Sequence, residues 1–337
     1  MNILLSSAGR RIGLARCLLG ACERIGLSGS RLIAADASRD APAAAHAHAS
    51  HRVPRCTEPG FVDAILALCE KERIGLIVPT IDTELGVYAA VKDRFAALGV
   101  RLAVSSPEAV AIADDKRATN AWLRAGGFPV PGQTTPARAL AERWRAPLIV
   151  KPVVGSGSVG LRRLEGRDEL AALAKQPGDW VVETIAPGEE YTVHIFVNTA
   201  GKCETAVPCR RVEVRAGEVS KACTRRIDVL IETARRIGEA LPGAYGPLNV
   251  QCFLDGEARC RVIEINARFG GGYPLVDRAG ASFVQHLIED AAGLSPSPID
   301  GWEDGLAMLR FDEAVFLSAA EAGWEQRCER QGAARAV

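Results

Sequence analysis

The stretch RVIEINARFGGG, Arg261 to Gly272, carries polar side chains in a place where a core strand is normally apolar. Its β-branched residues predict a strand, and strand alternation puts Glu264 and Asn266 on one face and the isoleucines on the other. Arg268 continues the polar face if the chain stays extended, and three glycines then free the backbone. A carboxylate, an amide and a guanidinium in a row indicate a binding site rather than a packed face.

A second strand, GPLNVQCFLD, precedes this stretch. The Asp-Gly dipeptide at 255–256 predicts a turn that joins the two strands into a hairpin. A four-residue loop pairs Asp255 with Cys260, and counting outward then places Gln251 opposite Glu264. The hairpin therefore brings side chains of its two strands together on one face.

Three of these side chains offer oxygen atoms, namely Gln251, Glu264 and Asn266. Hard cations such as Mg²⁺ prefer oxygen ligands and usually share them with substrate phosphates. Arg268, just beyond, is then placed to contact the phosphate being transferred. The alternative is the solvated face of an edge hairpin, which explains single polar residues but not this set followed by RFGGG.

A glycine-rich loop lies in KPVVGSGSVGLRRLE, where Gly155, Gly157 and Gly160 match G-x-G-x-x-G. A dinucleotide fingerprint requires a helix after the last glycine, whereas LRRLE predicts a second strand, and a Walker A loop ends in Gly-Lys-Ser/Thr, which is absent. A flap that covers phosphates with its backbone N–H groups fits better, with Lys151 on the strand before it. The alternative is a mobile Gly/Ser surface hairpin.

The segment DWVVETIAPGEEYTVHIFVN predicts a strand, a turn and a strand. An adenine ring needs backbone donors and acceptors from an extended hinge, and a ribose needs a carboxylate. The run Glu183-Thr184-Ile185 and the later Glu190 offer such groups. A hairpin with surface glutamates is the alternative.

The first hundred residues alternate predicted strands and helices in the order βαβαβαβ, which indicates an open parallel sheet covered by helices. Asp114 is expected to cap a helix that ends at Gly126. After APLIVKPVV the strands come in hairpin-like pairs, which indicates α+β structure. We therefore expect a domain boundary near residue 112.

Charge composition excludes two classes of partner. The chain has 41 basic and 41 acidic residues, which gives no general attraction to nucleic acid or anionic membrane. No run reaches the ~18 apolar residues that a membrane span needs. The N-terminus MNILLSS lacks a basic leader and is expected to be a first strand rather than a signal sequence. We therefore expect a cytoplasmic protein.

Cysteine and histidine give little indication of a metal site. The ten cysteines include no C-x-x-C pair, so they are expected to be reduced thiols packed as small hydrophobes. His46, His48 and His51 lie in an Ala-rich segment without a nearby carboxylate or thiol. We expect that segment to be a loop that binds no metal.

The N-terminal SSAGRRIG offers an alternative nucleotide site, because it follows a strand and opens a helix. Asp36 ends the second strand, as a ribose-binding acid would. However, Gly9-x-x-x-Gly13 lacks the middle glycine that lets a pyrophosphate approach. A nicotinamide-dependent enzyme that uses Gly9, Gly13 and Asp36 stays open as an alternative.

In this order, these pieces make the sequence resemble the ATP-grasp superfamily, in the branch of the carbamoyl-phosphate synthetase large subunit and the pyrrolysine-pathway ligase. The resemblance covers residues 1 to about 290, and the last 45 residues match nothing we can name. The matching segments are SAGRRIGLARCL, PTIDTEL, DDKRATNAWLRAGGFPVP, IVKPVVGSGSVG, VVETIAPGEEYTV, GPLNVQ and VIEINARFGGGYPL.

The resemblance implies a fold class of α/β and α+β, with a Rossmann-like pre-ATP-grasp parallel sheet followed by a two-subdomain ATP-grasp fold. The expected domains are 1–112 for the Rossmann-like domain, 113–187 for the small subdomain with the flap, and 188–337 for the large subdomain with a C-terminal extension. The cofactors implied are ATP and one or two Mg²⁺ ions.

The resemblance also implies a role for individual residues. In the family's pattern the nucleotide is held by Lys116, Lys151, the flap residues Gly155, Ser156, Gly157, Ser158 and Gly160, the hinge residues Glu183, Thr184 and Ile185, and Glu190 at the ribose. Gln251, Glu264 and Asn266 would bind Mg²⁺, and Arg268 would stabilise the transferring phosphoryl group. Many family members have a carboxylate where Gln251 stands, and the Gln form resembles the carbamoyl-phosphate synthetase type.

The implied activity is that of an ATP-dependent carboxylate–amine ligase, which activates a carboxylate as an acyl phosphate and joins it to an amine. A non-catalytic ATP-binding regulatory module, and ATP chemistry that stops at a phosphorylated product or uses carbamate, are further alternatives. The expected partners are small molecules, with no nucleic acid and no membrane, and a homodimer is common in the family.

Substrate contacts rest on fewer observations. Asp82 ends a strand of the first sheet, where open α/β sheets bind ligands, and could meet a substrate amine. Arg210, expected to be catalytic, and Arg211 could hold a carboxylate, and Lys221 could do likewise. A surface salt bridge is the alternative for each, and together they suggest an amino-acid-like or short peptide substrate.

Overall fold

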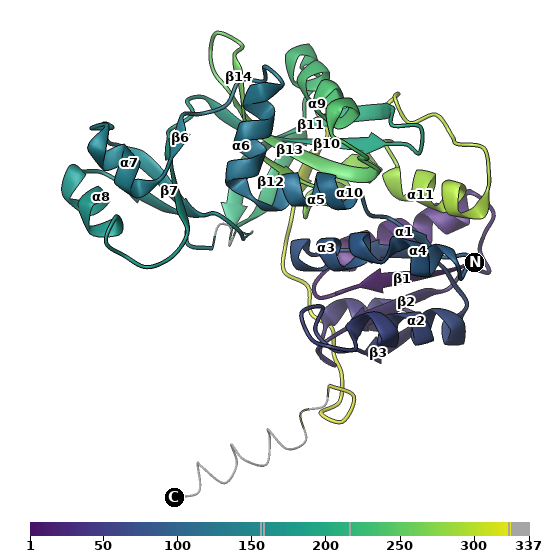
Figure 1. Ribbon diagram of the computed structural model, residues 1–337. Helices are drawn as coiled ribbons and strands as arrows, with labels where there is room; N and C mark the ends of the chain where they lie inside the picture. Colours follow the sequence, from purple (N-terminus) through teal and green to yellow (C-terminus); the bar gives the residue numbers. More distant parts are fainter. Residues whose placement is uncertain (156, 158, 216, 323, 325–337) are drawn as a thin grey trace, which may run out of the picture. The chain divides into compact units, whose positions relative to one another are not determined.

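The protein is described here from a computed structural model that covers residues 1–155, 157, 159–215, 217–322 and 324 (Figure 1). The chain divides into two compact units. Unit 1 comprises Met1–Ala103, Val284–Ser297 and the tail from Phe311, and unit 2 comprises Val104–Phe283 and Pro298–Arg310. The nucleotide-binding segments expected from the sequence all belong to unit 2.

Unit 1 contains a parallel five-stranded sheet of order β3-β2-β1-β4-β5, which confirms the predicted open α/β sheet. Its central strands are buried on both faces, as expected for parallel strands covered by helices. The elements are β1 (Asn2–Ser6), α1 (Ile12–Arg24), β2 (Leu32–Asp36), the 3₁₀ helix η1 (Pro42–His46), β3 (Ala49–Arg52), α2 (Phe61–Glu72), β4 (Ile74–Pro79), α3 (Asp82–Ala90), α4 (Lys92–Ala96), β5 (Arg101–Leu102) and, from its second residue on, α11 (Phe283–Ala292).

The segment around the three histidines is not the loop that we expected. It forms η1 and then β3, which extends the parallel sheet beside β2. His48 Nδ1 accepts a hydrogen bond from the Leu32 backbone at 3.0 Å, and His51 Nε2 lies 2.9 Å from Glu72 Oε1. These two side chains therefore have separate structural partners.

Unit 2 begins with two consecutive helices, α5 (Pro107–Asp114) and α6 (Lys116–Ala125). The prediction that Asp114 caps α6 is wrong by one residue. Asp115 is the cap, because its carboxylate accepts hydrogen bonds from the backbone N–H groups of Arg117 at 2.7 Å and Ala118 at 3.1 Å. This cap places Lys116 in the first turn of α6.

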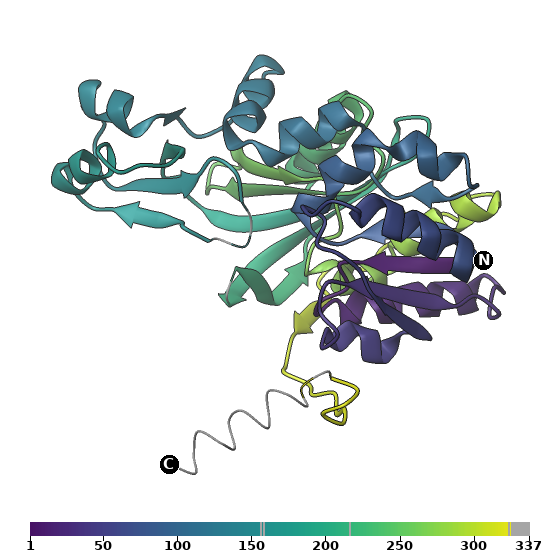
Figure 2. The same ribbon diagram turned by 60° about the horizontal axis from the view of Figure 1, so that its bottom comes forward.

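A four-stranded antiparallel sheet of order β6-β9-β7-β8 follows, here called the small sheet. Its helices α7 and α8 lie at one end of unit 2 (Figures 1 and 2). Leu148, Val150 and Val182 pack with apolar residues of these helices. The elements are β6 (Gln133–Thr134), α7 (Pro136–Ala141), β7 (Leu148–Pro152), β8 (Arg162–Leu164), α8 (Arg167–Leu173) and β9 (Trp180–Thr184). Because Val150 pairs with Val182, alternation puts Lys151 and Glu183 on the other face.

A six-stranded sheet of order β14-β13-β10-β11-β12-β15, here called the large sheet, completes unit 2. All its pairings are antiparallel. Helix α9 covers one face, where Gly238 approaches Ile195 and Val197. The elements are β10 (Glu189–Val197), β11 (Cys203–Arg215), β12 (Glu218–Thr224), α9 (Asp228–Ala240), β13 (Gly246–Leu254), β14 (Cys260–Asn266), α10 (Tyr273–Arg278) and β15 (Ala307–Leu309).

Strands β9 and β10 do not form the hairpin that we considered from the sequence. β9 pairs with β6 and β7 in the small sheet, whereas β10 pairs with β11 and β13 in the large sheet. The residues between them therefore carry the chain from one sheet to the other.

None of the helices in the described part of the chain has the length and apolar character needed to cross a bilayer.

Gly188, at the end of this connection, is expected to be essential for stability. Its φ is +106°, and a Cβ atom there would lie 2.0 Å from the carbonyl oxygen of Leu254. Gly188→Ala should lower the free energy of unfolding by about 2–4 kcal/mol, since it combines backbone strain with a backbone clash. Urea denaturation measures the loss. Gly256→Ala is the control, because a Cβ there meets nothing within 4 Å, and equal stabilities would contradict the argument.

Candidate active site

The face of the large sheet opposite α9 carries a group of polar side chains from β14, β13 and β10. Gln251 pairs with Glu264, and Asn249 pairs with Asn266. Directly opposed residues of an antiparallel pair project to the same face, so these amide and carboxylate oxygens share one face of the sheet. The predicted juxtaposition of Gln251 with Glu264 is confirmed.

The predicted turn of this hairpin is nevertheless wrong. Leu254, not Asp255, pairs with Cys260, so the loop is one residue longer than expected. The register then shifts between Gln251 and Cys252, which leaves Ile263 as an extra residue in β14. The bulge cancels the error in the turn and restores Gln251 opposite Glu264.

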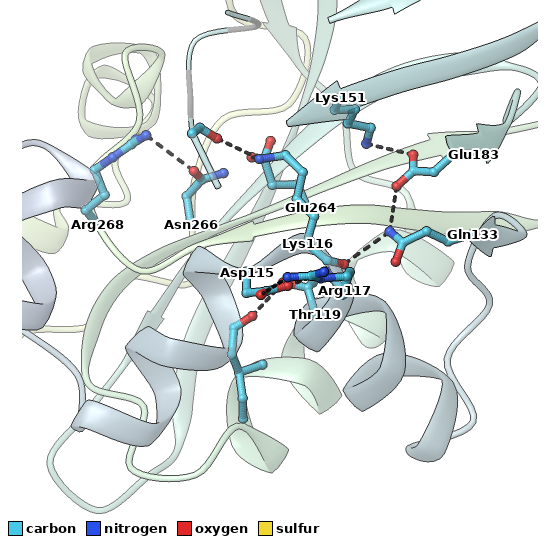
Figure 3. Close-up of polar contacts among 12 residues, drawn as sticks. Asp115, Lys116, Arg117, Thr119, Gln133, Lys151, Glu183, Glu264, Asn266 and Arg268 are labelled. Carbon is cyan, nitrogen blue, oxygen red and sulfur yellow. Dashed lines mark hydrogen bonds and ion pairs between the residues drawn. The ribbon is translucent and has the colours of Figure 1, made fainter. Parts of the chain in front are cut away.

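Lys116 connects α6 to both the flap and the large sheet. Its Nζ donates to the carbonyl oxygen of Gly155 at 2.6 Å and lies 3.9 Å from Glu264 Oε1 (Figure 3). Its backbone N–H donates to the carbonyl of Val153 at 3.0 Å, at the start of the flap. An ammonium group therefore stands between the flap and the expected metal ligands.

Lys151 and Glu183 form a buried ion pair on the face of the small sheet that α7 and α8 leave uncovered. Lys151 Nζ lies 2.7 Å from Glu183 Oε2, and the two residues are 8% and 4% exposed. Gln133 donates from Nε2 to the other carboxylate oxygen of Glu183 at 2.9 Å (Figure 3). The two charged residues expected at the nucleotide are thus in direct contact.

The remaining nucleotide candidates are distributed as follows. Gly155, Gly157 and Gly160 all have positive φ, a backbone conformation that favours glycine. Ser156 and Ser158 lie outside the described residues. Thr184 forms two hydrogen bonds with Gly132. The Thr184 backbone N–H donates to the Gly132 carbonyl at 2.9 Å, and the Thr184 hydroxyl accepts from the Gly132 N–H at 3.0 Å.

Ile185 follows as the first residue after β9 and is 37% exposed. Glu190 and Arg211, which we expected at the ribose and at the substrate, contact each other. Arg211 Nε lies 2.9 Å from Glu190 Oε1, and Arg211 Nη1 donates to Thr192 Oγ1 at 3.3 Å. Thr192 pairs with Gln251, so this arginine reaches the polar face of the large sheet.

The structure contradicts the placement of Arg210 beside that face. Arg210 pairs with Tyr191, whose side chain alternates with Thr192 and so lies on the face that α9 covers. Its guanidinium is 2.5 Å from Glu189 Oε1. Lys221 also lies away from the polar face, because its neighbour Ala222 pairs with Arg211 and adjacent strand residues point to opposite faces. Its ammonium lies 2.7 Å from Glu213 Oε2.

Asp82 belongs to unit 1, where it is the first residue of α3.

The segment considered as an alternative dinucleotide site, with Gly9, Gly13 and Asp36, is also in unit 1. Asp36 Oδ2 accepts the Gly9 N–H at 2.8 Å and Oδ1 accepts the Ser38 N–H at 2.8 Å. Both carboxylate oxygens already bind backbone amides, so Asp36 acts as a structural cap of this loop.

Arg268 lies beside Asn266 just beyond β14. Its Nη2 donates to Asn266 Oδ1 at 3.3 Å (Figure 3). Its Nη1 donates to the Phe269 carbonyl at 3.1 Å. Asn249 donates from Nδ2 to the Arg268 carbonyl. The polar run read from the sequence therefore stays together on one face past the end of the strand.

Sequence reasoning missed His194, Asn249 and Gln133. His194 pairs with Asn249 and is 2% exposed, and burial together with the charge of Arg211 lowers its pKa to about 3, so the ring is neutral at pH 7. The alternation of Glu190, Thr192 and His194 along β10 was a usable signal, because it marks the same polar face. Gln133 had no such signal, since its partners come from β9 and α6.

The oxygen-rich set Gln251, Glu264 and Asn266 fits a hard cation. Two amides and one carboxylate on adjacent strands suit Mg²⁺, which keeps some of its sites for waters and phosphate oxygens. No group of three His, Cys, Asp or Glu side chains among the described residues has the arrangement of a metal site. The set of amide and carboxylate oxygens therefore suits a hard cation that also takes oxygen ligands from water or phosphate.

Comparison with known families gives two matches. Residues 3–103 match the PylC-like N-terminal domain, and residues 113–272 match the ATP-grasp domain. Among curated relatives, an uncharacterized protein of Sinorhizobium fredii is 26% identical over 66% of this chain and 53% of its own length. The carbamoyl phosphate synthase large chain of Thermoplasma acidophilum is 26% identical over 70% of this chain and 25% of its own. The D-alanine–D-alanine ligase of Chromohalobacter salexigens is 28% identical over 58% of this chain and 68% of its own.

The first two of these relatives are thus matched over about half and a quarter of their length. Solved structures agree on the fold. A biotin carboxylase of Campylobacter jejuni superposes with a TM-score of 0.71 at 18% identity, over 91% of this chain and 74% of that chain. An L-amino acid ligase of Bacillus licheniformis gives 0.64 at 19% identity, over 86% and 73%. The predicted fold class is confirmed: the chain joins a PylC-like N-terminal domain to an ATP-grasp domain and belongs to the ATP-grasp superfamily.

Proposed function

We propose that this protein is an ATP- and Mg²⁺-dependent ligase that activates a carboxylate as an acyl phosphate and joins it to an amine, releasing ADP and phosphate. The observation that carries the proposal is the position of Lys116. Its ammonium contacts both the Gly155 carbonyl of the flap and, at 3.9 Å, the carboxylate of Glu264. A triphosphate with its Mg²⁺ needs cationic donors and oxygen ligands arranged in this way.

Each charged residue of the site has a distinct task in this scheme. Gln251, Glu264 and Asn266 would hold Mg²⁺, which when bound neutralises phosphate charge. Lys116 and Lys151 would bind phosphate oxygens beneath the flap glycines. Arg268, which is hydrogen-bonded to Asn266, would stabilise the charge on the phosphoryl group in transfer.

The reaction requires two displacements. A carboxylate oxygen attacks the γ-phosphorus of ATP, and the bond to the β–γ bridging oxygen breaks with its electron pair leaving on ADP. The amine nitrogen then attacks the acyl carbon, phosphate leaves with the electron pair of the C–O bond, and the nitrogen loses a proton. The protein contributes positioning and charge stabilisation, so no side chain has to act as a covalent nucleophile.

The substrates proposed are amino acids or short peptides. Arg211 supports this, because a guanidinium on the polar face of the large sheet can bind a carboxylate bidentately. Its present partner, Glu190, is expected to turn to the ribose hydroxyls when ATP binds. The D-alanine–D-alanine ligase and L-amino acid ligase among the similar proteins join amino acids, which supports the same class. A homodimer and one or two Mg²⁺ ions complete the proposal.

Nucleotide binding provides the first test. ATP·Mg²⁺ at 100 times its dissociation constant should stabilise the fold by about 2.7 kcal/mol and raise the melting temperature measurably. NAD and NADP should leave it unchanged, because both oxygens of Asp36 already bind backbone amides. A shift with NAD(P) but not with ATP would replace the ligase proposal with the nicotinamide alternative.

Turnover provides the second part of this test. A panel of amino acids and dipeptides with ATP·Mg²⁺ is followed by phosphate release and by product mass. Phosphate release that depends on an added amino acid, with a product heavier by one residue, is the expected result. ATP binding without turnover on any member of the panel would favour a regulatory module.

A further inference from the structure

Gln133 connects the two charged regions of the site through one amide group. It lies on the short edge strand β6, directly opposite Glu183 of β9. Its Nε2 donates to Glu183 Oε1 at 2.9 Å and to the backbone carbonyl of Lys116 at 3.1 Å (Figure 3). Both N–H bonds of the amide are therefore used, one toward β9 and one toward the start of α6.

This arrangement fixes the carboxylate of Glu183 from two sides. Gln133 binds Oε1, while the Lys151 ammonium lies 2.7 Å from Oε2. The Glu183 side chain is 5% exposed, so water does not compensate for a missing donor. Among the partners that the described residues supply, the carboxylate without Gln133 would keep the lysine and could rotate toward it.

The same amide also ties Glu183 to the phosphate-binding end of the site. Lys116 accepts from Gln133 through its carbonyl and reaches the flap at Gly155 through its side chain. The Lys116 carbonyl belongs to the first turn of α6, so its contact with Gln133 orients the amide toward Glu183.

The chemistry of Glu183 gives this support a consequence for base selection. A carboxylate only accepts hydrogen bonds, so it suits the 6-amino group of adenine and not the 6-oxo group of guanine. We infer that Gln133 is a positioning residue that holds Glu183 in place to select ATP over GTP. This inference rests on the proposed function and on the place at the nucleotide that the ATP-grasp resemblance implies for Glu183, which we take to contact the purine.

Two substitutions separate this role from simple packing. Gln133→Met keeps the shape and removes both donors, and it should raise the Kd of ATP·Mg²⁺ about tenfold, as expected for lost hydrogen bonds to a buried carboxylate. The Kd of GTP·Mg²⁺ should change less than twofold. The ratio of the GTP Kd to the ATP Kd should therefore fall about tenfold. The kcat at saturating ATP should stay within about twofold, because the reacting groups are untouched. Isothermal titration and steady-state kinetics give these values.

Gln133→Glu provides a second variant of the same size. It puts a second carboxylate beside Glu183, and two such groups cannot both ionise without cost. The Kd for ATP should therefore be weakest at pH 8 and recover toward pH 6, whereas the wild-type Kd stays nearly flat. Gln176→Met is the matched control, since Gln176 is exposed and accepts only from Arg162 among its described side-chain contacts.

The outcomes are distinct. If Gln133→Met raises the Kd values of ATP and GTP by the same factor, the ratio of the two Kd values is unchanged. That result would overturn the positioning role and leave only a packing role for Gln133. If Gln133→Met does not fold, a pH-independent Kd for Gln133→Glu overturns it instead. Failure of the wild type to bind ATP would count against the proposed function itself, before any variant is compared.

Discussion

Replacing Lys151 with methionine is expected to lower the free energy of unfolding by about 3–5 kcal/mol, because it leaves a buried carboxylate without its cation. Lys151 and Glu183 are 2.7 Å apart and almost fully buried. The same change should abolish measurable ATP binding, since the lysine is proposed to contact the phosphates. Urea denaturation and isothermal titration report the two effects separately.

A double variant distinguishes stability from binding. Lys151→Met combined with Glu183→Met removes both charges and should regain most of the lost stability, yet it should still not bind ATP. Lys202→Met is the control, because its pair with Glu239 is exposed and should contribute less than about 1 kcal/mol. Normal ATP affinity in a folded Lys151→Met protein would remove Lys151 from the site.

Glu264→Ala should reduce kcat/KM by a factor of about 10²–10³ or more while the fold is retained. Glu264 is the carboxylate of the proposed Mg²⁺ ligands, so its loss leaves only the amide oxygens of Gln251 and Asn266. The side chain is partly exposed and its contact with Lys116 is long, at 3.9 Å, so stability should change little. Phosphate release measured against Mg²⁺ concentration should show a higher Mg²⁺ requirement.

Glu257→Ala is the matched control for this experiment. Glu257 lies in the turn of the same hairpin and pairs only with Arg259 among its described ion-pair partners, with 73% of its side chain exposed. Its removal should leave turnover and Mg²⁺ dependence unchanged. Undiminished turnover of Glu264→Ala would refute the metal assignment and with it the proposed chemistry.

The parallel sheet of unit 1 could be predicted because four of its strands are short apolar runs between helices. β3 was missed for the opposite reason. Its residues Ala49–Arg52 alternate between half-buried and exposed, and the segment becomes a strand only by pairing with β2. A local pattern shows burial, but it does not show an edge pairing that depends on a partner strand.

The active site was predicted in part. The composition of the polar run was visible, and the pairing of Gln251 with Glu264 was found, although an unrecognised bulge at Ile263 offset an error in the turn. Strand alternation allowed only one of Arg210 and Arg211 to face the site. Which of the two does so depends on the register of β11 with β10, and this register is not encoded in β11 alone.

The sequence by itself determined which chemical groups are present and, within a regular strand, which neighbours share a face, because a strand repeats every two residues. Tertiary structure decided which elements meet. It sent β9 and β10 to different sheets, placed Lys116 against Glu264 and set Gln133 between β9 and α6. Such contacts join residues far apart in the chain, and their geometry depends on the packing of whole sheets and helices rather than on any local repeat.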